Sequence, residues 1–249
     1  MAGLNMTDVD LVALGNAEFL ELWEHGYRLH PLDRALLAIR TSLPPGATTD
    51  EPVADWPLGR RNRALAQVRM LYFGPRLEGW TVCPQCGEKL EFEVDCAAIA
   101  ATPLPEMERR VSARGGVYRL PTSRDLALVA GEADAERAAL QLLERCTLER
   151  NMTGEGDSLT PAAIDEIAAR MAEADPIAEI TLGFECPVCS RASQEVLDLA
   201  VFLWSEIESR ARRLLSEVHA LAAAYGWTEA AILGMSELRR ATYLRMVEA

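Results

Sequence analysis

The fold of this chain depends on two stretches of the same form, Cys83-Pro84-Gln85-Cys86 and Cys186-Pro187-Val188-Cys189. They hold four of the six cysteines among the 249 residues. One Cys-x2-Cys pair offers two thiolate ligands from a tight turn, and two pairs complete the tetrahedral ligand set of a zinc ion. Strand-like runs precede and follow each pair, at residues 77–82, 89–95, 180–184 and 192–198. The sequence therefore predicts two hairpins that share one Zn2+, a zinc ribbon split by a long insertion.

Other arrangements of these cysteines explain the pattern less well. Isolated buried thiols would not produce two identical Cys-Pro-x-Cys units. A disulfide within each unit is typical of redox enzymes, but neither unit opens a thioredoxin-like strand and helix. A secreted disulfide framework is not expected, because the amino terminus lacks the basic and apolar regions of a secretory signal. We expect one structural zinc ion, with no position left for water or substrate, bound by Cys83, Cys86, Cys186 and Cys189. The other two cysteines, Cys96 and Cys146, are expected to pack in the core.

Composition and charge limit the classes of partner. Hydrophobic residues make up 49% of the chain and charged residues 25%, as in ordinary folded proteins. No apolar run reaches the roughly 18 to 20 residues of a membrane span, so we expect a cytoplasmic protein without such a span. The net charge is −13 and Lys89 is the only lysine, whereas nucleic-acid affinity depends on clustered cations. Arginines do cluster at residues 60–69 and 210–213, within helical patterns where solvated faces and ion pairs are the common outcome. The charge argues against nucleic acid and favours a protein partner.

Most of the remaining chain has helical patterns. Near the amino terminus, start and stop signals predict a helix capped by Asn16 and ending near Gly26, a second from Pro31 to about residue 39 and a third from Pro57 to Gly74. The segment over residues 41–55 is expected to be a loop. In the insertion, we expect a strand at residues 116–121, a helix capped within residues 122–125, and helices over residues 133–148 and 161–174.

The carboxy-terminal segment has the clearest periodicity. Apolar residues recur there every three or four positions, as an apolar seam for a partner helix of this chain or another: Trp204, Ile207, Ala211, Leu214, Val218, Leu221 and Tyr225. Packing within the chain is the more common outcome for such a helix. Two short helices, capped at Thr228 and Ser236, are expected over residues 229–233 and 237–247.

These elements predict an α+β fold that is mainly α. We expect residues 1–76 and 199–249 to form the amino- and carboxy-terminal parts of one helical lobe. Residues 77–96 and 178–198 would be the two halves of the zinc ribbon, and residues 97–177 a largely helical insertion with one strand.

No catalytic arrangement can be identified in the sequence. His25, His30 and His219 stand alone, and neither a G-x-G-x-x-G nor a G-x4-G-K-[ST] phosphate loop occurs. The stretch Ser123-Arg124-Asp125 is similar to part of an active site, but a helix cap with a flanking ion pair explains it. We therefore expect a protein that is not an enzyme and that has no small-molecule substrate.

The chain as a whole resembles one family through short motifs in a fixed order around the cysteine pairs. These motifs are Ala35-Leu-Leu-Ala-Ile39, Pro57-Leu-Gly-Arg-Arg-Asn62, Phe73-Gly-Pro-Arg76, Leu120-Pro-Thr-Ser-Arg-Asp-Leu126, Phe202-Leu-Trp-Ser-Glu-Ile207, Glu217-Val-His-Ala-Leu-Ala222 and Tyr225-Gly-Trp-Thr-Glu229. In this order they resemble the zinc-ribbon baseplate proteins encoded with contractile phage tails and phage-tail-like contractile injection systems. The resemblance extends from about Leu14 to Leu244, and it depends on the ordered motifs more than on the cysteine pairs.

This resemblance implies a structural role. Members of the family are associated with the baseplate hub or its assembly and with no reaction, so the expected partners are other baseplate or hub proteins. The resemblance also implies that the four cysteines are metal ligands and that the aromatic and arginine positions are structural. A zinc-ribbon protein that binds nucleic acid or regulates is the alternative, and the acidic first hairpin, with Glu88, Glu91, Glu93 and Asp95, counts against it.

Overall fold

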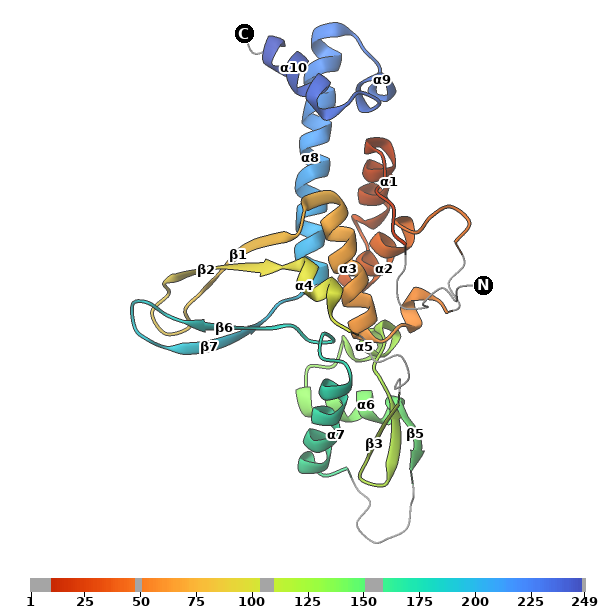
Figure 1. The fold of residues 1–249 in the computed structure, drawn as a ribbon, viewed down its shortest axis with the longest axis vertical. Helices are drawn as coiled ribbons and strands as arrows, with labels where there is room; N and C mark the ends of the chain where they lie inside the picture. The colour runs from red at the N-terminus through yellow and green to blue at the C-terminus, as the bar shows by residue number, and fades with distance from the viewer. Residues whose placement is uncertain (1–9, 48–50, 104–109, 151–158, 248–249) are drawn as a thin grey trace.

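A computed structural model of the chain describes residues 10–47, 51–103, 110–150 and 159–247. It is 56% helical and 17% strand, so the expected class, α+β and mainly α, is confirmed. Figure 1 shows an elongated molecule in which one long helix runs along the upper axis, two hairpins project to the side and a smaller module lies below. None of the helices in these ranges combines the length and apolar character that a bilayer span requires.

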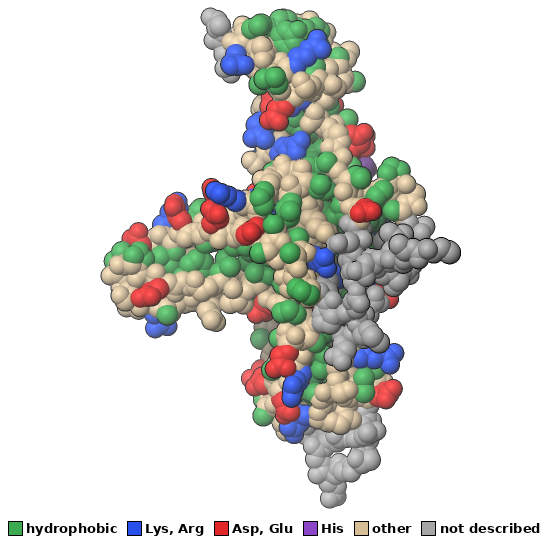
Figure 2. All heavy atoms as spheres, viewed as in Figure 1, with side chains coloured by type: hydrophobic (Ala, Val, Ile, Leu, Met, Phe, Trp, Pro, Cys, Tyr) green, Lys and Arg blue, Asp and Glu red, His purple; other side chains and the backbone are tan. Residues whose placement is uncertain are grey.

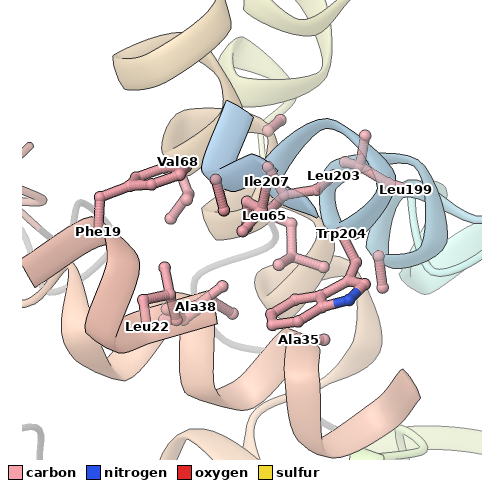
Figure 3. Packing of buried hydrophobic residues seen from close by; sticks show 14 of the residues in the cluster. Phe19, Leu22, Ala35, Ala38, Leu65, Val68, Leu199, Leu203, Trp204 and Ile207 are labelled. Atoms are coloured by element: carbon pink, nitrogen blue, oxygen red, sulfur yellow. The ribbon is translucent and has the colours of Figure 1, made fainter. Parts of the chain in front are cut away.

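Amino- and carboxy-terminal helices form one lobe around a shared core. The main helices are α1 (Asn16–Gly26), α2 (Pro31–Thr41), α3 (Leu58–Phe73) and α8 (Leu199–Tyr225), with a short 3-10 turn, η1 (Val53–Asp55), before α3. Figure 3 shows Phe19 of α1 and Leu65 of α3 packed with Ile207 of α8 in this core. Each of these side chains is fully buried, which stabilises the fold by about 1.5–3 kcal/mol per residue. The expected packing of the terminal segments against each other is confirmed.

Helix α8 buries a single stripe, because its apolar residues recur at helical spacing. Six of the seven expected residues are buried: Trp204, Ile207, Ala211, Leu214, Val218 and Leu221. The prediction is wrong at Tyr225, which is 39% exposed and stacks on Trp227 with ring centroids 4.5 Å apart. Asp198 starts the helix by accepting hydrogen bonds from the backbone N–H groups of residues 200 and 201, and Gly226 ends it at a φ of 68°.

Local signals also set the ends of the other lobe helices. The expectation that Asn16 caps α1 is wrong: Gly15 is at the cap position, and the Asn16 side chain donates to the backbone oxygen of Leu233, 3.0 Å away. That bond ties α1 to α9 (Glu229–Leu233). Helices α9 and α10 (Glu237–Val247) have the predicted bounds.

Two hairpins form an arm that leaves the lobe between α3 and α8. Strand β1 (Arg76–Val82) pairs antiparallel with β2 (Lys89–Asp95), and β6 (Thr181–Glu185) pairs antiparallel with β7 (Ala192–Val196). Figure 1 shows the hairpins next to each other, with their turns at the far end of the arm. In the described part of the chain, no strand of one hairpin pairs with a strand of the other. Since an isolated two-stranded hairpin is marginally stable in water, the arm needs another source of stability.

The insertion has a small core of its own. Helix α4 (Cys96–Ala101) leads into it and still buries Cys96 and Ile99 in the lobe core. The insertion then comprises β3 (Arg110–Ala113), β4 (Gly116–Arg119), α5 (Ser123–Val129), α6 (Ala135–Cys146), β5 (Thr147–Arg150) and α7 (Pro161–Ala174). The three strands form one antiparallel sheet, and Tyr118, Leu143 and Ile167 are the buried centre. The sequence pattern predicts neither β3 nor β5. It also extends α6 to residue 148, whereas this helix ends at Cys146 and the chain enters β5 at Thr147. The insertion is thus less purely helical than expected.

The first turn of α3 joins the insertion to the lobe. The Asp175 carboxylate, at the end of α7, accepts a hydrogen bond of 2.8 Å from the backbone N–H of Gly59. The Asn62 side-chain amide donates to the backbone oxygens of Ile177 and Ala178, 2.8 and 3.1 Å away. Pro57 precedes α3 and cannot cap it with its side chain, so Asp175 caps this helix from a distant part of the sequence.

Two arginines of α3 lie in the interior. Arg69 is 3% exposed, binds Glu206 of α8 through two hydrogen bonds of 2.9 and 2.7 Å, and donates to the backbone oxygen of Gly74. Arg61 is 7% exposed and donates to the side-chain oxygen of Asn62. The expectation of a solvated face is wrong for both, because α3 is surrounded by other helices; the expectation of an ion pair is right for Arg69.

Candidate metal centre

All four predicted ligands meet at the outer end of the arm. The sulfur atoms of Cys83, Cys86, Cys186 and Cys189 lie within 4.8 Å of one another. The Cys83 and Cys189 sulfurs are 3.6 Å apart, and those of Cys86 and Cys186 are 3.5 Å apart. A tetrahedral zinc ion with Zn–S bonds of about 2.3 Å would place its ligand sulfurs about 3.8 Å apart. These are free thiols, at a separation far above the roughly 2.05 Å of a disulfide.

Both cysteine turns have the same backbone geometry. In the first turn, the N–H of Cys83 donates to the Glu88 oxygen and the N–H of Gly87 donates to the Cys83 oxygen. In the second, the equivalent bonds run from Cys186 to the Arg191 oxygen and from Ser190 to the Cys186 oxygen. The fourth residue after each first cysteine has a positive φ, 74° at Gly87 and 55° at Ser190. Glycine adopts this conformation freely, whereas serine is strained in it.

The electrostatics of the centre favour a bound cation. Backbone N–H groups of Cys86 and Gln85 donate to the Cys83 sulfur and lower the pKa of that thiol to about 6. The backbone N–H of Glu88 has the same effect on Cys86, but burial and the contact with Cys186 outweigh it and raise the pKa of Cys86 to about 12. The Cys83 thiol therefore ionises readily, whereas Cys86 keeps a proton that a divalent cation would displace. The charge of that cation would offset two of the four negative charges of the thiolates. The residues present fit a metal ion.

Few apolar side chains support the centre. Its buried cluster consists of Cys83, Leu90 and Cys186, with Phe184 packed against it. A cluster this small contributes little burial energy, so the sulfur ligands are the main link between the hairpins at this end of the arm.

An aromatic path connects the arm to the lobe. Phe92 of β2 lies between Phe184 of β6 and Phe202 of α8, with ring centroids 5.8 and 5.9 Å away. A Cβ atom at Gly79 would lie 2.5 Å from the Phe92 ring, so glycine is what allows this ring to cross β1. No local sequence pattern indicates the Phe92 contacts or the need for a glycine at position 79.

Other candidate residues lie outside the centre. Cys96 and Cys146 are fully buried, as expected, and each has an arginine nitrogen 3.9 Å from its sulfur. His25 and His219 are exposed, and His30 accepts a hydrogen bond from the backbone N–H of residue 32 at the start of α2.

Asp125 takes part in the predicted helix cap, at the start of α5, and in the predicted ion pair. Its buried carboxylate accepts two hydrogen bonds from Arg119, at 2.6 and 2.8 Å, and one from Arg145 at 3.1 Å. The backbone N–H and the hydroxyl of Thr122 donate to it as well, at 2.9 and 2.8 Å. Burial alone would raise the pKa of Asp125, but the hydrogen bonds from Arg119 and Thr122 hold this pKa well below its usual range.

The arrangement suits a structural metal ion. Four sulfur ligands complete a tetrahedral set and leave no position for a water or a substrate.

Comparisons of the chain with protein-family models, curated proteins and solved structures found no match.

Proposed function

We propose that this chain is a non-enzymatic structural or assembly protein of the baseplate of a contractile, phage-tail-like injection system. In this proposal Cys83, Cys86, Cys186 and Cys189 bind one structural zinc ion per chain. The zinc ribbon is a rigid module that binds other baseplate or hub proteins, in the cytoplasm where the particle assembles.

The four-thiol centre is the observation that carries this proposal. It joins two hairpins whose strands, in the described ranges, do not pair with each other and whose buried cluster beside the sulfur atoms is small. A metal ion held there would supply folding free energy on the order of 10 kcal/mol and make the arm rigid. A rigid arm projecting from a helical lobe suits a protein that fixes the relative orientation of its neighbours.

The positions of the ordered motifs support a structural role for them. The motif over residues 57–62 contains Gly59 and Asn62, which join α3 to the insertion. The motif over residues 202–207 supplies Phe202, which contacts the arm, and Ile207, which lies in the lobe core. The resemblance to baseplate proteins thus concerns residues that hold the modules of this chain together.

The acidic arm counts against the nucleic-acid alternative. Residues 76–95 carry five carboxylates and two cations, and affinity for phosphate backbones depends on clustered cations.

Deletion of the gene in a host that produces contractile particles tests the proposal. We expect particles without a complete baseplate, seen by electron microscopy, and the same defect after a Cys186→Ser substitution. A Gln85→Ala substitution is the matched control, since Gln85 is an exposed residue of the cysteine turn and its backbone donor is retained. Normal numbers of complete, contractile particles after deletion would overturn the proposal. Mass spectrometry of purified particles would separate a permanent component from an assembly factor.

A further inference from the structure

The outward face of the first hairpin is apolar at its centre and acidic around it. Trp80 and Val82 of β1 are 60% and 50% exposed. Next to Trp80 is a hollow of about 620 Å³, lined in part by Glu78, Glu91 and Glu93. The Lys89 ammonium lies 5.7 Å from the centre of the Trp80 ring and 2.8 Å from the Glu91 carboxylate, so this ring and this carboxylate already contact one cation of the hairpin. We call this surface, formed by Glu78, Trp80, Val82, Glu91 and Glu93, the arm face.

Two carboxylates of the arm face are unfavourable for the hairpin itself. Glu78 and Glu93 are directly opposite in the strand pairing, and like charges in that position destabilise a sheet. Glu93 has a long, exposed contact of 3.8 Å with Arg76, and Glu78 forms no ion pair with any residue in the described ranges. A cation from outside the hairpin would relieve this repulsion.

Helix α10 offers the complementary chemistry at the far end of the molecule. At 100° per residue, five of its residues fall within one face of about 120°: Leu238, Arg239, Thr242, Arg245 and Met246. Leu238 and Met246 are 76% and 60% exposed, and both arginines of this face are exposed. The third arginine of the helix, Arg240, points the other way and is bound to Glu217. We call this surface the tip face.

The surface of the molecule is more acidic along the arm than at the end formed by α9 and α10. Figure 2 shows several Asp and Glu side chains along the arm, with a few Lys or Arg side chains among them, and Lys or Arg side chains among hydrophobic ones at the end of the molecule that α9 and α10 form.

The two faces of one molecule are too far apart to meet. Helix α8 has 27 residues, about 40 Å, and Figure 1 shows α10 at its upper end while the arm projects from the level of its lower half. We propose that the tip face of one molecule binds the arm face of a second copy, with Leu238 and Met246 packed on Trp80 and the two arginines paired with the arm carboxylates. Because each copy has both faces, the contact is head-to-tail and forms open chains or closed rings. This inference does not depend on the proposed function.

Sedimentation of the full-length, metal-loaded protein over a range of concentrations tests it. We expect oligomers at about 50 mM salt that weaken at about 500 mM, as screening predicts. Trp80→Ala should weaken association about thirtyfold, as for a buried interface tryptophan. Leu128→Ala, at a residue that is 60% exposed on α5 and outside both faces, is the matched control and should have no effect.

Charge reversal identifies the two faces as partners. Glu78→Arg with Glu93→Arg, and separately Arg239→Glu with Arg245→Glu, should each weaken self-association at least about tenfold. A mixture of the two variants should associate again, because each then meets a face of opposite charge. Metal content and circular dichroism of each variant show that it is folded. A wild-type protein that stays monomeric at low salt would overturn the inference, as would folded variants whose mixture fails to associate. Either result would also be expected if the arm face bound a different protein.

Discussion

The Asp125→Asn substitution should destabilise the insertion strongly. The buried carboxylate accepts five hydrogen bonds from Arg119, Arg145 and Thr122, and these bonds join the end of β4, the start of α5 and the end of α6. Breaking a buried ion pair costs about 3–5 kcal/mol. Since the Arg119 and Arg145 side chains are 30% and 44% exposed, water compensates in part, and we expect a loss near 3 kcal/mol.

The effect should depend on pH. The pKa of Asp125 is lower in the folded protein than in the unfolded chain, so the folded state is stabilised wherever the carboxylate is ionised in both. This stabilisation is complete above the unfolded pKa of about 3.9 and is lost as the pH falls towards the folded pKa. The difference between wild type and Asp125→Asn should therefore be constant near neutral pH and shrink below about pH 4.

Hydrogen exchange of backbone amides in α5 and α6, measured by mass spectrometry at several pH values, gives the local free energy of opening. Asp165→Asn is the matched control, since Asp165 is an exposed carboxylate of the same module, and it should change this free energy by less than about 0.5 kcal/mol. A loss below about 1 kcal/mol for Asp125→Asn, or a loss that persists unchanged in acid, would show that the ionised Asp125 carboxylate does not stabilise the insertion.

Three further predictions concern the lobe, the cysteine turns and nucleic acid. Leu214→Asp places an unpaired carboxylate in the lobe core and should unfold the lobe in a denaturant titration, at a cost of several kcal/mol; intact stability with failed particle assembly would mean that the seam of α8 faces a partner chain. Ser190→Gly relieves a backbone strain of about 1–2 kcal/mol, offset by about 0.4–1 kcal/mol of unfolded-chain entropy. It should slow metal loss to a chelator a few-fold, while Gly87→Ser should speed it, and effects of the opposite sign would contradict the strain argument. Duplex DNA should not bind detectably at physiological salt in a mobility-shift assay, and a salt-sensitive complex of micromolar affinity or tighter would support a regulatory role.

Elements with strong local signals could be predicted from the sequence. Helix α7 has the predicted bounds because Pro161 fits its first turn and Thr160 caps it. The strands beside the cysteine turns were within one or two residues of their predicted positions, because each hairpin has its turn fixed by the cysteines. The stripe of α8 followed from spacing alone, except at Tyr225, where the helix ends.

Features that depend on distant contacts could not be predicted. Strand β5 is four residues long and forms because it pairs with β4. No local sequence pattern predicts this pairing. Arg69 is buried because Glu206, 137 positions later, lies beside it, and a helical pattern cannot show that α3 has neighbours on all sides. The capping of α3 by Asp175 has the same cause, since its partner Gly59 is 116 positions away.

The ligands of the candidate site could be predicted from the sequence, but the side-chain contacts around them could not. Four cysteines in two identical units leave few alternatives, whereas the contact of Phe92 with Phe184 and Phe202 joins three separate segments. The positive φ at residue 87 could be predicted because glycine favours it, whereas a serine at the equivalent position 190 does not indicate a positive φ.

Elemental analysis of the folded protein shows whether the four cysteines hold a zinc ion. We expect one zinc ion per chain, lost together with the folded ribbon after chelation or after Cys186→Ser, because a structural zinc site supplies folding free energy on the order of 10 kcal/mol. Cys96→Ala is the control, since Cys96 is buried outside the centre, and its folded fraction should keep the ion. A soluble, folded protein that contains no metal would contradict the account.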